Sequence, residues 1–377
     1  MAIRAEEAIQ AAKEAKSETL RLDLKVIIGA KHDCYGELAK AKPLLDETIH
    51  IARSIDHKPA LLGGLVWRGQ IHFFQTEYER SEELMSETRA LAEELRDGFQ
   101  LLHSLFFLGL IAGNMGRISE AFARLNEATE MARRNGDHFW VSRLPNCIGW
   151  IHRELQDFDH ALKHDQQGLE VARADQVLEA ESNSLINLGI DHLYAGDSEK
   201  TLPAFHEVED IFKRDAWFRW RYNFRLQAAA SEYWLSEGQI ENAETYARKL
   251  LELATYYEAH KYIAIAHKLL AQTAIAREDP PEGEKQLHAA LEQLRNYPAP
   301  LVAWKTYAEF GRLKSKLGDG PAAREAFAQA AEIVNSIATN VSDQNLRSTF
   351  LNSAAVSEVM REAAKMAQSG RGASEPH

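Results

Sequence analysis

The hydrophobic pattern of this chain repeats about every 40 residues. One copy is clearest between Leu105 and Ala128, in the stretch LFFLGLIAGNMGRISEAFARLNEA. Large apolar residues surround Gly109, a glycine suited to a turn follows at Gly116, and small residues recur at Ala121 and Ala128. Apolar residues at helical spacing on both sides of Gly116 predict two helices joined by a tight turn. The small residues let the two backbones pack closely.

The same pattern occurs eight times in the chain. The small residue of the first helix recurs in steps of 40 residues, with a single step of 42, at Gly29, Gly69, Gly109, Gly149, Gly189, Ser231, Ala271 and Gly311. A second small residue follows twelve positions later in each copy, from Ala41 to Ala323. A fixed period over eight copies indicates an array in which each helical pair buries its apolar face on its neighbours.

The spacing of Gly109, Gly116, Ala121 and Ala128 resembles that of tetratricopeptide repeats, although the usual repeat has about 34 residues. HEAT-type arrays also have periods near forty, but the glycine–glycine–alanine pattern favours the tetratricopeptide interpretation. The resemblance implies an all-α fold: a right-handed α-solenoid of about eight helix-turn-helix repeats with capping helices at its ends.

Two stretches carry a further resemblance: WFRWRYNFRLQAAASEYWLSEGQIENAETYARKLLELA, from Trp217 to Ala254, and DQNLRSTFLNSAAVSEV, from Asp343 to Val359. Both are similar to the C-terminal sensor arrays of bacterial signalling proteins that join an ATPase to an adenylate cyclase, a kinase or a DNA-binding domain. The resemblance implies that the array receives a ligand or partner and controls an upstream domain.

We divide the chain into four parts. Residues 1–16 align with the second helix of a repeat, and we expect either a capping helix or a half-repeat of a longer array. Residues 17–338 hold the eight repeats, 339–367 a C-terminal capping helix that begins at Ser342 and Asp343, and 368–377 a disordered polar tail. Pro145 falls inside the first helix of repeat four, where it predicts a kink.

Composition and motifs narrow the function. The formal net charge of −12 disfavours nucleic acid and anionic membranes as partners, and residues 101–112 form the longest apolar stretch, too short to span a bilayer. Two distant cysteines, Cys34 and Cys147, favour a reducing cytoplasmic compartment. We find no phosphate-binding loop, HExxH, GxSxG or CxxC motif, so we predict a non-catalytic protein without a cofactor.

Histidines offer two further features. His160 and His164 lie one helical turn apart beside Asp159 and Asp165, a spacing that suits metal ligands. We interpret them as a solvated helix face and predict no metal site. Other histidines recur three residues after the small position, at His32, His72, His152 and His192. Packing with one hydrogen bond would account for them, as would a ladder that titrates near neutral pH.

The first helices of tetratricopeptide arrays line a concave groove. The repeat register selects candidate binding residues on that face: Phe73, Phe74, Asn114, Arg143, Asn146, Trp150, Arg153, Asn183, Tyr194, Arg225 and Glu232. Their amide, guanidinium and aromatic groups suit a peptide, because amides bond its backbone and arginines bind its acidic groups. A lysine–asparagine clamp for a C-terminal carboxylate is not evident, which disfavours chaperone tails.

Trp217 and Arg221 complete the candidate set. They belong to the stretch WFRWRYNFRLQ, at the place where the repeat step lengthens to 42 residues. The aromatics could enlarge an inter-repeat core while the arginines pair with Asp210, Asp215 or Glu232. Alternatively, the stretch could dock an acidic or aromatic partner. We expect a hinge of the array near Trp217.

These observations support three hypotheses. The first is a regulatory array that binds a protein or peptide segment in its groove, such as an upstream effector domain of the same protein. The second is a small-molecule sensor, with its ligand enclosed by repeats four and six. The third is a structural adaptor that uses its outer face. A pocket of small-molecule size favours the second hypothesis, and an open groove favours the first. The oligomeric state is not predicted.

Overall fold

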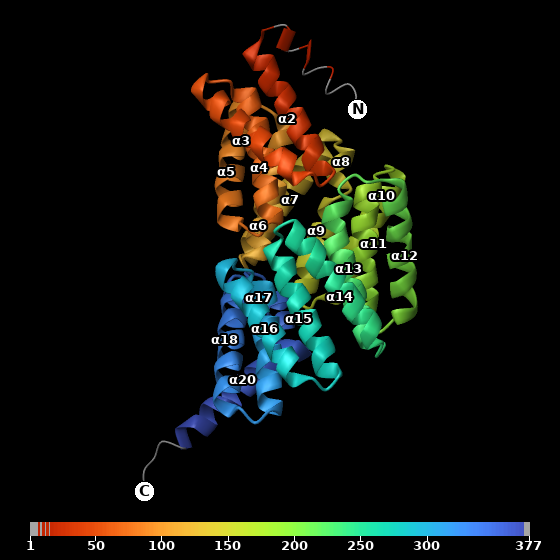
Figure 1. Cartoon of the computed structure of the whole chain (residues 1–377), viewed down its shortest axis with the longest axis vertical. Coiled ribbons are helices and arrows are strands. Elements are labelled where there is room, and N and C mark those ends of the chain that lie inside the picture. Colours follow the sequence, from red (N-terminus) through yellow and green to blue (C-terminus); the bar gives the residue numbers. More distant parts are fainter. Residues whose placement is uncertain (1–6, 8–9, 12, 15, 373–377) are drawn as a thin grey trace.

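The computed structural model describes residues 7–372, except 8, 9, 12 and 15. Most of the predicted N-terminal cap or half-repeat therefore lies outside the described residues. The described part of the chain is helical throughout and contains no strand (Figure 1). Within it, no helix is both long enough and apolar enough to cross a membrane.

Eight helical pairs follow one another, as the repeat pattern predicts. Their bounds are α2 (Glu18–Cys34) and α3 (Leu38–Ser54); α4 (Lys58–Phe74) and α5 (Tyr78–Leu95); α6 (Gly98–Asn114) and α7 (Ile118–Asn135); α8 (His138–Val141) with α9 (Leu144–Glu154), and α10 (Phe158–Ala174); α11 (Leu178–Tyr194) and α12 (Ser198–Arg214); α13 (Arg219–Ser236) and α14 (Ile240–Tyr256); α15 (His260–Ala276) and α16 (Pro280–Asn296); α17 (Pro300–Lys316) and α18 (Gly320–Thr339). The fold is thus an α-solenoid of tetratricopeptide type.

Small residues hold each pair together, as expected. A Cβ atom at Gly109 would lie 2.8 Å from the Leu125 side chain, and one at Gly189 would lie 2.3 Å from Phe205. Between the paired helices, Gly116 has a φ of +77°, which glycine adopts without steric cost. Repeats two, four and seven lack this glycine and place another residue in the same left-handed region, for example Thr76 at +69°.

Pro145 does more than kink repeat four. The first helix of this repeat is divided into α8 and α9, with Ser142 and Arg143 between them. Pro145 lies in the first turn of α9, where its missing N–H leaves no helical hydrogen bond unmade. At the break, the backbone N–H of Arg143 donates to Trp140 rather than to Phe139, and the Phe139 carbonyl accepts a 2.5 Å hydrogen bond from Arg143 Nη1 instead. The break thereby directs a buried arginine toward the inner face of the array.

The C-terminal cap differs from the expected single helix. Asp343 caps α19 (Gln344–Asn352) by accepting hydrogen bonds from the backbone N–H groups of Asn345 and Leu346, at 2.8 and 2.9 Å. Ser353 is extended, with φ −60° and ψ 150°, and begins a separate helix, α20 (Ala354–Gly372). This helix continues past residue 367, so residues 368–372 of the expected disordered tail are helical, while 373–377 lie outside the described residues.

The array winds far enough for its late repeats to stack on its early ones (Figure 1). The backbone N–H of Phe218 donates to the carbonyl of Cys34 over 2.8 Å, which joins repeat six to repeat one. Further along, Lys261 donates to Asn114 and Lys305 to Glu154, at 2.9 and 2.8 Å. These contacts place the predicted concave groove between two turns of the superhelix.

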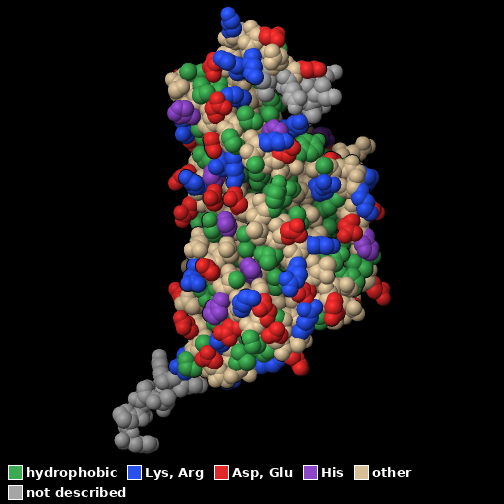
Figure 2. Space-filling view, viewed as in Figure 1, with side chains coloured by type: hydrophobic (Ala, Val, Ile, Leu, Met, Phe, Trp, Pro, Cys, Tyr) green, Lys and Arg blue, Asp and Glu red, His purple; other side chains and the backbone are tan. Residues whose placement is uncertain are grey.

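The outer surface is of mixed charge. Figure 2 shows lysine, arginine, aspartate and glutamate side chains interspersed over the viewed face. The net charge of −12 is therefore not gathered into one acidic patch on this face.

Candidate functional site

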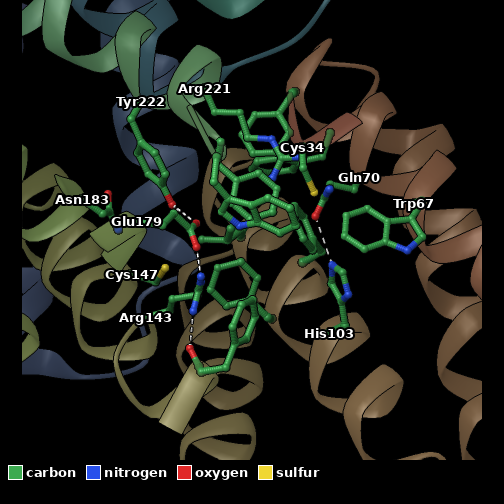
Figure 3. A pocket seen from close by; sticks show the side chains of 18 of the residues that line it. Cys34, Trp67, Gln70, His103, Arg143, Cys147, Glu179, Asn183, Arg221 and Tyr222 are labelled. Atoms are coloured by element: carbon green, nitrogen blue, oxygen red, sulfur yellow. Dashed lines mark hydrogen bonds and ion pairs between the residues drawn. The ribbon is translucent and has the colours of Figure 1, made fainter. Parts of the chain in front are cut away.

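A pocket of about 490 Å³ lies between the two turns of the superhelix (Figure 3). Its walls come from the first helices of repeats one to five, from α13 and the residues just before it, and from the start of α15. Ile27 and Phe99, which are 53% and 43% exposed, line it at the surface and mark its mouth. The volume is typical of a site for a compact ligand rather than for a long chain segment.

One side of the pocket carries a buried polar chain. Asp33 forms an ion pair with Arg221, and Gln70 Nε2 donates to Asp33 Oδ2 over 2.5 Å. The Gln70 carbonyl oxygen in turn lies 3.1 Å from His103 Nε2 (Figure 3). Since that oxygen can only accept, Nε2 of His103 carries the proton and Nδ1 is left as an acceptor.

Burial sets the charge states of this chain. It lowers the pKa of His103 to about 3, and the positive charges of Arg221 and Arg143 act in the same direction. His103 is therefore neutral at physiological pH. Burial also raises the pKa of Asp33, against the opposing effect of Arg221.

The opposite side holds a second polar group. Arg143 forms a buried ion pair with Glu179, whose Oε1 accepts a 2.5 Å hydrogen bond from the Tyr222 hydroxyl. The Arg143 guanidinium lies 3.4 Å from the ring centroid of Phe139. Burial lowers the pKa of Arg143 to about 10, so it remains charged at neutral pH. Arg143 and Arg221 thus each have an acidic partner that keeps them in place, whereas Arg225 donates to the side-chain oxygens of Asn183 and Asn187.

Aromatic side chains supply most of the remaining wall. The Arg221 guanidinium is held between rings, 4.1 Å from the centroid of Phe218 and 4.4 Å from that of Phe74. His103 contacts Trp67, Phe107 and Trp140, with centroids 5.2–5.4 Å apart. Apolar walls around a few fixed polar groups are the usual composition of a ligand site.

The structure brings most of the candidate residues to this pocket. Ten of the thirteen line it: Phe73, Phe74, Asn114, Arg143, Asn146, Trp150, Asn183, Trp217, Arg221 and Arg225. The other three, Arg153, Tyr194 and Glu232, line an adjoining pocket of about 330 Å³ that shares Asn114, Trp150 and Arg225 with the first. The groove register therefore gathers these side chains on one inner surface.

Arg153 is committed to the protein interior. It forms ion pairs with Asp165 at 3.0 Å and with Asp191 at 2.5 Å, and all three side chains are buried. Asp165 packs against Gly149 at the position where Leu125 packs against Gly109 in the preceding repeat. A charged cluster thus replaces an apolar contact in repeat four. Because the Asp165 carboxylate belongs to this cluster, it does not join His164 as a metal ligand.

The pairing expected for the arginines of the 217–227 stretch is wrong. Arg221 pairs with Asp33 of repeat one, and Arg219 donates to the carbonyl of Phe212 over 3.0 Å. The reason is the superhelical closure, which brings repeat one against α13. The aromatic residues were expected to enlarge a core between neighbouring repeats. Trp220 packs on Tyr257, and also on Phe74 of the distant repeat two.

Sequence reasoning missed a ring of pocket residues at the starts of the first helices. They lie ten or nine positions before the small residue of their repeats: Phe99, Gln100, Phe139, Trp140, Glu179, Tyr222, Lys261 and Tyr262. Phe139 lies seven positions, or two helical turns, before the candidate Asn146, and Trp140 lies three positions, or about one turn, before the candidate Arg143. Extending the candidate positions toward the starts of the first helices would have found these residues.

The recurring histidines form local hydrogen bonds. His32, His72 and His152 each contact, through Nδ1, a carboxylate five residues later, at Glu37, Glu77 and Asp157. This arrangement fits the packing interpretation. In repeat four, His160 also contacts Asp157, and His164 stacks on His152 with centroids 5.5 Å apart.

Comparison with solved structures gives a likeness along nearly the whole chain. A Rap protein complexed with competence and sporulation factor is 14% identical, with a TM-score of 0.66, over 90% of this chain and 95% of the Rap chain. NprR in complex with its cognate peptide NprX is 14% identical over 92% of this chain and 99% of that chain, with a TM-score of 0.47. A STAND protein with a tetratricopeptide repeat sensor from Pyrococcus horikoshii is 14% identical over 91% of this chain and 54% of that chain, with a TM-score of 0.47.

No protein-family model matches the sequence, and no curated protein sequence does either. The likeness to the Rap protein concerns the fold, since the identity is low. Together with the eight helical pairs, it establishes the chain as an α-solenoid of tetratricopeptide type.

Proposed function

We propose that this protein is a non-catalytic regulatory receptor that binds a short peptide or protein segment in the pocket between the two turns of its superhelix. The Rap protein of the same fold is complexed with competence and sporulation factor, which supports the proposal of a regulatory ligand. The proposal includes a cytoplasmic location, which the two free cysteines favour.

The observation that carries the proposal is a set of buried polar atoms in the pocket wall with open hydrogen-bonding capacity. Gln100 Oε1, His103 Nδ1 and Arg221 Nε have no hydrogen-bond partner within the described part of the chain. The first two are acceptors and the third is a donor. Burying such atoms without partners costs free energy. The three atoms are shielded from solvent, so a ligand bonds to them, and gains affinity, when their side chains turn toward it.

A peptide backbone offers the complementary groups. Its N–H groups can donate to Gln100 and His103, and its carbonyl groups can accept from Arg221. The surrounding aromatic rings provide space for apolar or aromatic side chains of the ligand. Since the pocket has a volume of about 490 Å³, we propose a peptide of a few residues or the end of a chain.

By its volume alone the pocket fits the small-molecule hypothesis, so a small metabolite is the second candidate. The peptide stands first because backbone N–H and C=O groups complement the unpaired atoms of Gln100, His103 and Arg221. Binding would be transmitted through the closure between repeats one and six, whose residues line the pocket directly. The effector that responds is either a separate protein or another domain of a longer polypeptide.

Affinity selection from a library of short random peptides tests the proposal. Ala30 lines the pocket, so Ala30→Trp should fill it, whereas Ala39→Trp places the same side chain on the exposed face of α3. We expect peptides selected on the wild-type protein to bind Ala39→Trp equally and Ala30→Trp at least tenfold more weakly. Peptides that bind both variants alike would contradict the proposal. Metabolite binding with the same variant dependence, and no selectable peptide, would favour the second candidate.

A further inference from the structure

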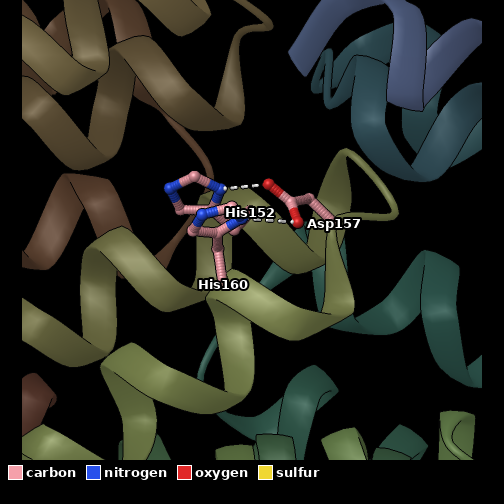
Figure 4. A group of neighbouring side chains, drawn as sticks. All are labelled: His152, Asp157 and His160. Atoms are coloured by element: carbon pink, nitrogen blue, oxygen red, sulfur yellow. Dashed lines mark hydrogen bonds and ion pairs between the residues drawn. The ribbon is translucent and has the colours of Figure 1, made fainter. Parts of the chain in front are cut away.

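Two histidines and one carboxylate converge at the turn between α9 and α10 (Figure 4). His152 Nδ1 lies 2.9 Å from one oxygen of Asp157, and His160 Nδ1 lies 2.9 Å from the other. One nitrogen or oxygen from each of the three residues lies within 4.8 Å of the others. This group lies at the turn of repeat four and contains none of the residues that line the pocket.

Comparison between the repeats shows what is unusual here. In repeat one, Glu37 contacts His32 and also accepts a hydrogen bond from Lys40 over 2.8 Å. In repeat five, Asp197 is bonded in the same way by Lys200. Each carboxylate therefore has a basic side chain three residues later. At the corresponding place in repeat four, His160 replaces the lysine.

Negative charge reaches this turn from two segments of the chain, while Lys163 supplies positive charge beside His164. Asp157 faces two imidazoles, which carry no charge when neutral, and the negative charge of Asp343 at the start of α19 also acts on His152. His164 adds a third imidazole, stacked on His152 at 5.5 Å. Imidazole nitrogens and a carboxylate oxygen are the ligands that zinc and other first-row divalent ions prefer.

We propose that His152, Asp157 and His160 bind a divalent transition-metal ion of the Zn²⁺ type. His152 and Asp157 are largely buried, with side chains 15% exposed, and fix two ligands on the framework. The His160 side chain is 63% exposed, so it can rotate onto the ion and leaves a further coordination position open to water. His160 and His164 by themselves did not predict a metal site, because the other imidazole of the group, His152, precedes the turn.

The bound ion would tie the end of α9 to the start of α10 in the repeat whose first helix is broken. It would thereby take the place of the lysine ammonium in repeats one and five. The site does not depend on peptide binding, so it can be tested separately from the proposed function.

Calorimetric titration of the full chain, freed of any affinity tag, with Zn²⁺ tests the site. His160→Lys restores the side chain of repeats one and five, and His50→Lys removes an exposed histidine on α3 as a control. We expect one ion to bind the wild type and His50→Lys with equal affinity, and the affinity of His160→Lys to fall at least tenfold. The Co²⁺-loaded wild type should show visible ligand-field bands that His160→Lys lacks.

Asp157→Asn provides a second variant, and circular dichroism confirms that each variant is folded. Absence of saturable Zn²⁺ binding by the wild type would overturn the site. Undiminished binding by His160→Lys or by Asp157→Asn would overturn it as well, since the ion would then be held elsewhere.

Discussion

Asp33, near the end of the first helix of repeat one, forms a buried ion pair with Arg221, in the first turn of the first helix of repeat six. The two residues are 188 positions apart in the chain. Their side chains are 0% and 5% exposed, and Trp220 Nε1 donates to the carbonyl of Asp33 over 2.8 Å. This contact holds the two turns of the superhelix together beside the pocket.

Breaking this pair should loosen the closure. Asp33→Asn leaves the Arg221 charge buried without its counter-charge, and loss of one partner of a buried pair costs about 3–5 kcal/mol. We expect a lower urea midpoint and a larger radius of gyration by X-ray scattering, because the late repeats can rotate about residues 215–218. The exposed bridge of Lys42 to Glu258 joins the same two turns, so Lys42→Gln is the control, expected to cost at most about 1 kcal/mol. Equal effects of the two variants would contradict the prediction.

Replacing Gln100 should weaken ligand binding without lowering the stability of the fold. The Oε1 atom of Gln100 is buried and lacks a partner within the described residues, so Gln100→Leu should leave the free energy of unfolding unchanged or raise it. The same change removes one hydrogen bond to a bound peptide and should weaken binding about 2- to 12-fold, the equivalent of about 0.5–1.5 kcal/mol. Fluorescence anisotropy with a selected peptide measures this. Gln167→Leu, at an exposed position of α10, is the control. Unchanged affinity in Gln100→Leu would exclude a contact at this amide.

Lys261 should make stability depend on pH in the alkaline range. Burial lowers the pKa of Lys261 from 10.5 to about 8, although the negative charge of Glu154 acts to raise it. Between pH 8 and 10.5 the unfolded chain therefore binds more protons than the folded chain, so this group makes stability rise with pH, by at most about 1.4 kcal/mol per unit. The difference in unfolding free energy between wild type and Lys261→Met, measured from pH 7 to 10, should show this rise. A constant difference would contradict it.

Asp165 should make the stability of the fold fall, rather than rise, with increasing pH. Burial raises the pKa of Asp165 above the ordinary 3.8, despite the Arg153 charge, and the neighbouring Asp191 charge adds to the increase. The folded state then holds its proton more tightly than the unfolded state, so this group makes stability fall as the pH rises above 3.8. Asp165→Asn keeps the shape of the side chain and should flatten that fall in urea midpoints measured from pH 4 to 8. An unchanged slope would show that another group is responsible.

The fold was predictable because each repeat is a local unit. The spacing of Gly109, Gly116 and Ala121 reflects contacts within one helical pair, and such contacts recur with the period of the sequence. The groove positions followed from the same register. Arg225 and Asn183, for example, were each selected by their distance from a small residue, and both line the pocket.

The closure of the superhelix was not predictable from the period. The contacts of Asp33 with Arg221 and of Lys261 with Asn114 depend on how small rotations between repeats add up along the array. No single repeat records that sum. For the same reason, the acidic partners of Arg221 and Arg143 were found only in the structure.

The group of two histidines and one aspartate at the α9–α10 turn was also not predicted from the sequence. His152 belongs to a recurring set with a structural explanation, whereas His160 belongs to a different helix. Only the fold of repeat four places both imidazoles on one carboxylate.

Hydrogen–deuterium exchange of the protein with and without a selected peptide tests the central claim most directly, because it locates the ligand. We predict slower exchange in the first turns of α6, α11 and α13, which contribute Gln100, Glu179 and Arg221 to the pocket wall. The second helices of the same repeats, α7, α12 and α14, should be unaffected. Protection confined to those second helices, on the outer face, would contradict the claim and favour a structural adaptor.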